Sequence, residues 1–184
     1  SIRTASKSAW ARLPSIFVWY GLLALIARIG TPASLNQSLT QVIDLVRFQL
    51  RKSGVEPRFE LDPRDPWIVG DRFQVEQLFL NLVLNALQAM PEGGTLTLRT
   101  RRQGAWELVE VCDTGSGIPE AIRERIFDPF FTTRDVGKGT GLGLAVSYNI
   151  ASAHGGGLEV ETTEGEGSIF RVLFPADEDQ EEEA

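Results

Sequence analysis

The stretch from Gln77 to Gln88 constrains the fold of this chain more than any other. Every residue in it is apolar except four amides, namely Gln77, Asn81, Asn85 and Gln88. Because these lie at i, i+4, i+8 and i+11, a helix places them on one narrow stripe and leaves most of its surface apolar. The amides of such a buried helix need polar partners, since an unpaired buried amide costs about 1–3 kcal/mol.

Two interpretations of the stripe stay open at this point. An asparagine carbonyl is a hard oxygen donor that suits Mg²⁺, which keeps several waters and uses few protein ligands. Alternatively, the stripe is the thin solvent-facing edge of a helix that is otherwise buried.

Composition excludes several classes of protein. The single cysteine and the single histidine exclude a disulfide framework and a zinc cluster. The formal net charge is −7, but six of the 25 acidic residues lie within 177–183, which leaves 19 acidic against 18 basic residues elsewhere. This balance argues against nucleic acid as a main partner, and residues 177–184 are expected to form a disordered acidic tail.

Residues 1–31 form a basic and apolar segment of a different character. No acidic residue precedes Asp44, and Leu13–Ala27 is an uncharged, largely apolar run of 15 residues. A membrane-spanning helix needs about 20 such residues. The run could be a signal-like segment, an amphipathic or docking helix, a linker, or the end of an upstream element in a larger protein.

Beyond this segment the pattern predicts helices that alternate with strands. Gly30–Ser34 is typical of a linker, and Ser34 and Asp71 are suitable N-caps. We expect one domain over residues 32–176, with helices over 35–53, 72–90 and 140–154, a short helix within 114–139, and strands over 58–61, 67–69, 95–102, 106–113, 157–162 and 168–174. This order favours an α/β fold, specifically a two-layer sandwich with a mostly antiparallel sheet.

The run Val111–Pro119 places an acidic residue directly after a predicted strand. Asp113 is followed by Gly115 and Gly117, which let backbone approach a flat ligand without intervening side chains. A buried carboxylate accepts hydrogen bonds and can therefore read an exocyclic amine such as that of adenine. A tight turn after a strand explains the same residues without a ligand.

The run Gly137–Gly143 leads straight into a predicted helix. Its backbone N–H groups and the helix N-terminus could face a chain of phosphates. It is not a Walker A loop, because Gly139 follows Lys138, and it lacks the last glycine of a dinucleotide-binding loop.

Between these two loops lies an aromatic cluster, Ile126–Arg134. A cluster of this kind on a segment bounded by proline and glycine favours a lid that packs differently with and without ligand. Plain hydrophobic anchoring of a loop is the alternative.

The order and spacing of these four stretches closely resemble the ATP-binding catalytic domain of sensor histidine kinases. Asn85, Asp113-x-Gly115-x-Gly117, Phe127–Phe131 and Gly139-x-Gly141-x-Gly143 are similar to that family's N, G1, F and G2 boxes. The sequence from Asn85 to Thr95 resembles that of the nitrogen-regulation type of these kinases. The resemblance covers about Leu35 to Pro175 and implies a Bergerat-type sandwich, with a mixed sheet, three main helices on one face and a mobile lid.

The resemblance also implies a set of site residues. Asn85 would hold Mg²⁺, and Asn81, one turn earlier, would face the phosphates; both would be catalytic. Asp113 would accept a hydrogen bond from the adenine amine, and Lys138 could add a cation near the phosphates. The full set expected to bind ATP is Asn81, Asn85, Gln88, Asp113, Gly115, Gly117, Ile118, Phe130, Thr132, Thr133, Lys138, Gly139, Thr140, Gly141, Leu142, Gly143 and Ser168.

The implied activity is transfer of the ATP γ-phosphate to a histidine. That acceptor would lie on a dimerisation domain that is not evident in this chain, because the only histidine, His154, lacks an acceptor motif. A response regulator and a homodimeric parent protein are the implied partners, and the implied location is cytoplasmic, in a parent kinase with or without a membrane anchor.

Two other functions stay open. A related ATPase would use a glutamate four residues before Asn85, where this chain has Asn81, whose amide cannot abstract a proton from water. The other alternative is a non-catalytic module that senses nucleotide and binds a partner.

Overall fold

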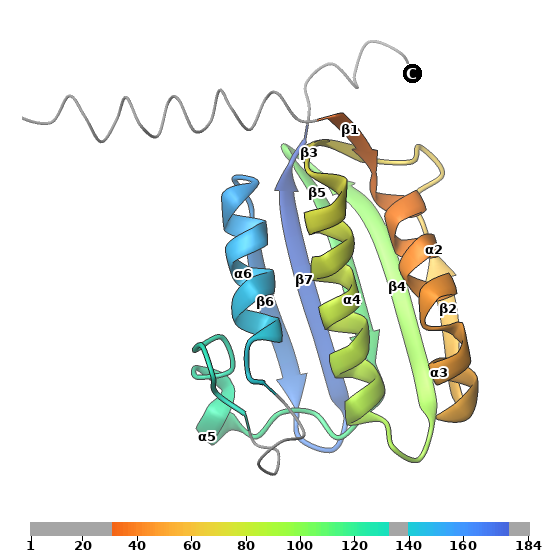
Figure 1. Ribbon diagram of the computed structural model, residues 1–184, viewed down its shortest axis with the longest axis vertical. Helices are drawn as coiled ribbons and strands as arrows, with labels where there is room; N and C mark the ends of the chain where they lie inside the picture. Colours follow the sequence, from red (N-terminus) through yellow and green to blue (C-terminus); the bar gives the residue numbers. More distant parts are fainter. Residues whose placement is uncertain (1–30, 133–139, 177–184) are drawn as a thin grey trace, which may run out of the picture.

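The computed structural model describes residues 31–132 and 140–176. Its main sheet is mixed, with one parallel pair at the β2–β4 edge and antiparallel pairs elsewhere. The strand order is β2-β4-β5-β7-β6, as Figure 1 shows. The five strands are β2 (Val55–Glu60), β4 (Gly94–Gln103), β5 (Trp106–Asp113), β7 (Gly167–Pro175) and β6 (Gly157–Thr163).

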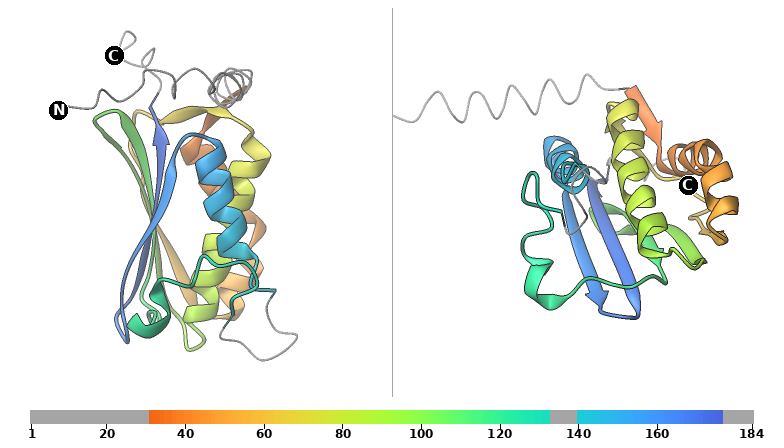
Figure 2. Two further views of the ribbon diagram at one scale, coloured as in Figure 1. Left: turned by 90° about the vertical axis from the view of Figure 1, so that its left-hand side faces the viewer. Right: turned by 60° about the horizontal axis from the view of Figure 1, so that its bottom comes forward.

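All the longer helices cover one face of this sheet, so the molecule has two layers (Figure 2). They are α2 (Leu35–Leu45), α3 (Arg47–Lys52), α4 (Arg72–Ala89) and α6 (Gly143–Ala153). A short helix, α5 (Glu120–Arg123), lies in the segment between β5 and α6. The predicted α/β sandwich, with its mostly antiparallel mixed sheet and its helices on one face, is confirmed.

The core lies between α4 and the sheet. Phe79 and Leu82 of α4 are fully buried, as are Val109 and Val111 of β5. On β4 the buried residues alternate because successive side chains point to opposite faces, whereas β5 is buried on both faces. Each large apolar side chain that is fully buried contributes about 1.5–3 kcal/mol, so this contact layer is what fixes α4 on the sheet.

The prediction of a linker over Gly30–Ser34 was wrong where the structure describes it. Thr31–Ser34 form strand β1, which pairs antiparallel with β3 (Trp67–Gly70) in a separate two-stranded sheet. The two strands are far apart in sequence, so no local pattern could reveal that they pair. The predicted boundaries around residues 32–176 stay predictions, because residues 1–30 and 177–184 lie outside the described residues.

Two helix boundaries also differ from expectation. The helix expected over residues 35–53 is two helices, because Val46 adopts φ −99° and ψ 9° between α2 and α3. The helix expected from residue 140 begins at Gly143, since Gly141 takes φ +64° and a left-handed residue cannot continue a right-handed helix. The predicted caps Ser34 and Asp71 are confirmed, with side-chain bonds to Gln37 and Phe73 N–H of 3.0 and 2.9 Å.

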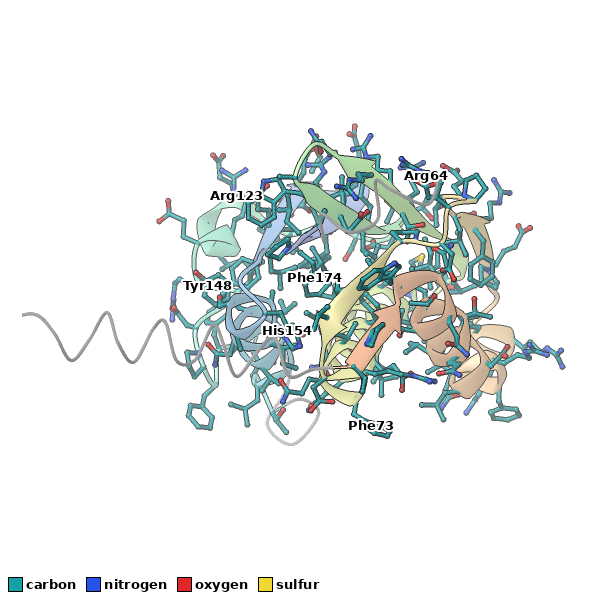
Figure 3. The ribbon with its side chains drawn as sticks, turned by 90° about the horizontal axis from the view of Figure 1, so that it is seen from above. Arg64, Phe73, Arg123, Tyr148, His154 and Phe174 are labelled. Atoms are coloured by element: carbon teal, nitrogen blue, oxygen red, sulfur yellow. The ribbon has the colours of Figure 1, made fainter. Side chains whose placement is uncertain are left out.

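His154 joins the end of α6 to the beginning of α4. Its Nδ1 lies 2.8 Å from the Ile150 carbonyl oxygen, and its Nε2 accepts a 3.2 Å hydrogen bond from the Asp71 N–H. This pair of contacts requires a proton on Nδ1 and none on Nε2. The ring also packs edge-on against Phe174, and Figure 3 shows the two side chains together. Both ring nitrogens therefore serve the fold, as expected for a histidine that is not a phosphate acceptor.

A row of alternating charges crosses the sheet face that carries no helix. Arg99 opposes Glu110 on the next strand, and Glu110 in turn opposes Arg171. Arg171 Nε lies 2.8 Å from Glu110 Oε1, and Arg99 Nε lies 2.5 Å from Glu60 Oε2 at the β2 edge. Opposite charges on directly opposed residues stabilise neighbouring strands. Ion pairs therefore stabilise this face of the sheet, whereas the other face is stabilised by apolar packing against helices.

Asp62 makes the stability of the fold depend on pH. Arg64 donates to both carboxylate oxygens, and this lowers the pKa of Asp62 from its ordinary value of 3.8 to about 2. The folded state then binds fewer protons than the unfolded state between these pH values, so stability falls as pH falls from about 5 to 2. We expect Asp62→Asn to be less stable by about 1 kcal/mol at pH 7 and to lose less stability on acidification.

Urea denaturation at pH 7, 4 and 2.5 measures this difference. Asp128→Asn, which changes an exposed carboxylate, is the matched control. Parallel stability curves for Asp62→Asn and the unchanged chain would contradict the assignment.

Candidate functional site

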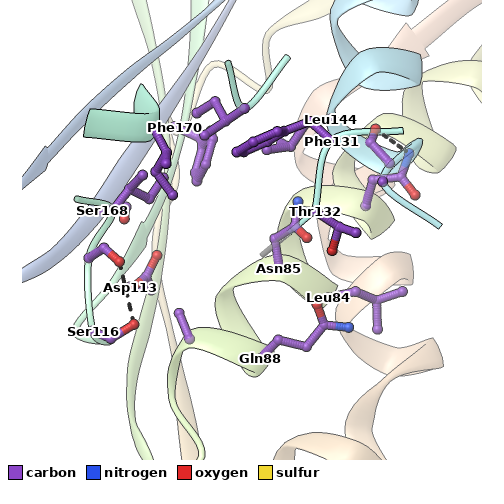
Figure 4. Close-up of a pocket in the computed structure, with 18 of the residues that line it drawn as sticks. Leu84, Asn85, Gln88, Asp113, Ser116, Phe131, Thr132, Leu144, Ser168 and Phe170 are labelled. Carbon is purple, nitrogen blue, oxygen red and sulfur yellow. Dashed lines mark hydrogen bonds between the residues drawn. The ribbon is translucent and has the colours of Figure 1, made fainter. Parts of the chain in front are cut away.

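A cavity of about 540 Å³ lies where α4, the ends of β5 and β7, and the beginning of α6 meet. Figure 4 shows its two polar sides. Asp113, Ser116 and Ser168 lie on one side, and Asn85 and Gln88 of α4 face them from the other. Segments far apart in the sequence therefore combine to line one cavity.

Eleven of the residues predicted for the site line this cavity. They are Asn81, Asn85, Gln88, Asp113, Gly117, Ile118, Thr132, Thr140, Gly141, Gly143 and Ser168. Gly115, Phe130 and Leu142 do not line it. Thr133, Lys138 and Gly139 fall outside the described residues, as do the last two residues of the predicted lid, Thr133 and Arg134.

The amide stripe of α4 is divided between the cavity and the solvent. Asn81, Asn85 and Gln88 line the cavity, whereas Gln77 is exposed away from it. Asn81 Nδ2 donates to the Gly143 carbonyl oxygen at 3.1 Å and to Ser147 Oγ at 3.3 Å. Within the described residues the buried Nδ2 of Asn85 has no hydrogen-bond partner. Such a buried N–H group can donate to a water molecule or to a ligand in the cavity.

Asp113 is a buried carboxylate, with 6% of its surface exposed. Burial raises its pKa, and hydrogen bonds from the N–H groups of Gly115 and Ser168 partly offset this effect. The Gly115 N–H lies 2.9 Å from Oδ1. No salt bridge reaches this carboxylate from the residues that the structure describes, so Asp113 is suited to accept a hydrogen bond from a neutral donor.

The loop after β5 depends on close backbone contacts. At Gly117, where φ is +66°, a Cβ would lie 2.1 Å from the Thr163 carbonyl oxygen. The neighbouring Ile118 N–H donates to Thr162 Oγ1 at 2.9 Å. At Gly115 a Cβ would lie 2.5 Å from the carbonyl oxygen of Ala89. Gly115 therefore lets the loop pack against the end of α4, which is why it does not line the cavity.

The aromatic segment contributes Phe131 rather than Phe130. Phe130 takes φ +67° and is 74% exposed, while its N–H donates to the Gly141 carbonyl oxygen at 2.9 Å. The next residue, Phe131, lines the cavity, and the Arg125 guanidinium lies over its ring, 4.5 Å from the ring centroid. Because adjacent phenylalanines share the same local pattern, the sequence alone could not decide which ring lines the cavity.

Sequence reasoning missed the apolar wall of the cavity. Leu84 precedes Asn85 and lies three residues after Asn81, so helical spacing could have found it. Phe170 lies two residues after Ser168 on the same strand face, so strand alternation could have found it as well. The missed residues are Leu84, Ala89, Ser116, Pro119, Ile122, Ile126, Phe131, Leu144 and Phe170.

The donor set of the cavity fits a magnesium ion that arrives with phosphates. Within the described ranges no three acidic, histidine or cysteine side chains gather in a way that could hold a metal alone. Mg²⁺ commonly takes one or two protein oxygens and completes its shell with waters and phosphates. Asn85 lines the cavity, and its Oδ1 is an oxygen ligand of that kind, whereas its unpartnered Nδ2 can only donate a hydrogen bond.

Residues 70–178 match the family described as histidine kinase-, DNA gyrase B-, and HSP90-like ATPase. The chain belongs to this family. The match spans α4, both glycine-containing loops and the last hairpin, and therefore every element that lines the cavity. As an ATPase-type domain of this family, the chain uses nucleotide.

The relatives with similar sequences are named sensor kinases. Sensor kinase CckA of Brucella abortus is 41% identical over 155 residues, which is 74% of this chain and 16% of the relative. Sensor histidine kinase ZraS of Escherichia coli is 37% identical over 141 residues, which is 77% of this chain and 30% of the relative. The chain thus spans at most about a third of the curated relatives it matches.

Solved structures agree with these relatives. The catalytic domain of histidine kinase ThkA has a TM-score of 0.73 and 34% identity, covering 82% of this chain and 97% of that one. Full-length ShkA in complex with AMPPNP has a TM-score of 0.71 and 27% identity, covering 85% of this chain and 36% of that one. The chain is therefore a homologue of histidine kinase catalytic domains. Among its described helices, none is both long and apolar enough to cross a membrane.

The close contact at Gly117 makes a testable prediction about the site. Gly117→Ala adds a Cβ against the Thr163 carbonyl in a left-handed conformation, so we expect a loss of about 2 kcal/mol and a Tm decrease of roughly 4–8 °C. Gly157→Ala is the control, because nothing lies within 4 Å of its added Cβ. Thermal unfolding measures both, and equal Tm values would disprove the tight packing of this loop.

Proposed function

We propose that this chain is the Mg-ATP-binding catalytic domain of a two-component sensor histidine kinase. It would transfer the γ-phosphate of ATP to a histidine on a separate dimerisation domain. One observation carries the proposal: a buried carboxylate, Asp113, and the amides of Asn81 and Asn85 line one cavity of nucleotide size. The carboxylate suits the adenine amine, and the amides suit the hydrated, metal-bound phosphates.

At the adenine end, Asp113 would accept a hydrogen bond from the exocyclic amine. The pKa of Asp113 is raised because burial removes water from its carboxylate, and a hydrogen bond from a ligand would replace part of that lost solvation. Ser168 lies beside it, and Gly117 and Ile118 would contact the flat face of the base. The apolar wall formed by Phe170 and its neighbours supports the same orientation.

At the phosphate end, Asn85 would hold Mg²⁺, which neutralises charge on the phosphates when bound. Gly141 and Gly143 precede and begin α6, whose N-terminal N–H groups favour anions. Thr140 and Gln88 also line the cavity. By resemblance alone, Lys138 and Gly139 would add a cation and a backbone contact there, with Thr132 and Thr133 nearby.

The partners follow from the reaction class. Phosphate would pass to a dimerisation domain that carries the acceptor histidine and then to a response regulator, within a homodimeric parent kinase. Named sensor kinases such as CckA and ZraS support this assignment, as does the AMPPNP complex of ShkA. We propose a cytoplasmic location for this domain, where ATP is available.

A hydrolytic ATPase is less well supported. The position one turn before Asn85 holds Asn81, whose Nδ2 donates to α6. An amide cannot abstract a proton from water, so hydrolysis in this cavity would lack a general base at this position.

We expect Asn85→Ala and Asp113→Ala each to weaken Mg-ATP binding at least about tenfold, a loss of about 1.4 kcal/mol. The first variant removes the metal donor and the second removes the adenine acceptor. Calorimetry measures both, and the controls are Asn149→Ala and Asp128→Ala, which change exposed residues outside the cavity. Unchanged affinity in both site variants would reject the site assignment.

The chain alone should not autophosphorylate, because both ring nitrogens of His154 are engaged in the fold. Radiolabelled ATP should nevertheless label an added histidine-containing dimerisation domain from a relative. ATP binding without transfer to any such acceptor would favour a nucleotide-sensing module. Acid-labile label on the isolated chain that disappears in His154→Ala would refute the first statement.

A further inference from the structure

A buried serine on α6 touches the amide stripe of α4. Ser147 is fully buried and lies one turn after Gly143. The Ser147 hydroxyl donates its only hydrogen to the Gly143 carbonyl oxygen, with Oγ and the oxygen 2.9 Å apart. Its lone pairs then accept the hydrogen bond from Asn81 Nδ2, at 3.3 Å.

These contacts fix which way the Asn81 amide points. Nδ2 donates to both the Gly143 carbonyl oxygen and Ser147 Oγ. The reversed amide would place Oδ1 3.1 Å from the Gly143 carbonyl oxygen, with no hydrogen between them. The hydrogen-bond network therefore assigns the nitrogen to α6 and leaves the oxygen for the cavity.

We propose that Ser147 is a positioning residue that holds Asn81 as a hydrogen-bond acceptor in the phosphate end of the site. The inference deepens the proposed function and rests on it. Ser147 does not line the cavity, so it acts through Asn81 and not by touching nucleotide.

The fixed orientation determines what Asn81 can recognise. Because Nδ2 donates to α6, Oδ1 is the polar atom of Asn81 that is left for the cavity. Its Oδ1 can coordinate a cation or accept a hydrogen bond, for example from a water molecule that hydrates the phosphates or their cation. Asn81 thus complements Asn85, whose Nδ2 has no partner among the described residues.

The first test reads the amide directly, without any reaction. In ¹⁵N NMR spectra of the full 184-residue chain, Asn81→Ala assigns the Nδ2 signals by their disappearance. In Ser147→Ala we expect those signals to shift and their hydrogens to exchange about tenfold faster. Unchanged signals would overturn the proposal.

The second test separates positioning from folding. Ser147→Ala should lower phosphotransfer to a supplied dimerisation domain about tenfold at saturating Mg-ATP, with ATP affinity changed less than about twofold. Ser38→Ala is the matched control, because Ser38 is equally buried on α2 and its hydroxyl has no partner among the described residues. Ser38→Ala should leave the transfer rate unchanged.

A double-mutant cycle completes the test. If Ser147 acts through Asn81, then Asn81→Ala and the double variant Asn81→Ala/Ser147→Ala transfer phosphate at the same rate. Multiplicative rate losses would show that Ser147 only stabilises the helix and would overturn the proposal. If the unchanged chain neither binds Mg-ATP nor transfers phosphate, the proposed function fails, while the NMR result still decides whether Ser147 orients the amide.

Discussion

Burial of α4 is the constraint on which the rest of the structure depends. This helix is apolar on nearly every side, so the sheet covers one side and α2 and α6 pack along its flanks. The amides of the stripe would be unpaired against apolar side chains. Asn81, Asn85 and Gln88 therefore line the gap that remains between α4, α6 and the strand ends, where Asn81 also bonds to α6, while Gln77 is exposed. The same apolar packing that stabilises the domain thus creates the cavity and decides which side chains face it.

Strand β5 shows how one element gives two carboxylates opposite roles. Glu110 and Asp113 are both buried, but they lie on opposite faces because side chains alternate along a strand. Glu110 is surrounded by guanidinium groups, with Arg171 at 2.8 Å and Arg101 at 3.5 Å, so its charge is compensated within the fold. Asp113 has backbone N–H donors but no described cation, so burial raises its pKa. A structural carboxylate is satisfied by its own protein, whereas a binding carboxylate retains capacity for a ligand.

The connection between α4 and α6 relates the fold to the proposed chemistry. Asn81, Ser147 and the Gly143 carbonyl join the two helices beside the cavity, and His154 joins the opposite end of α6 to the N-cap of α4. Two polar contacts at separate points fix both the position and the direction of α6. The N-terminus of α6 is then held at the phosphate end of the site, where positioning and charge stabilisation are what phosphoryl transfer requires.

The sequence by itself determined the elements whose signals are local. The caps Ser34 and Asp71, the amide spacing of α4, and the strand followed by Asp113 and two glycines are patterns within a few residues, and the structure bears out the elements that they predict. Together with the family resemblance, they located eleven residues of the cavity. Tertiary structure decided what depends on contacts between distant segments. The pairing of Thr31–Ser34 with β3 is one example, and the choice of Phe131 over Phe130 is another. The direction of the Asn81 amide belongs to the same group, because its partners are more than 60 residues away in the chain and come within hydrogen-bonding distance only when α4 and α6 pack.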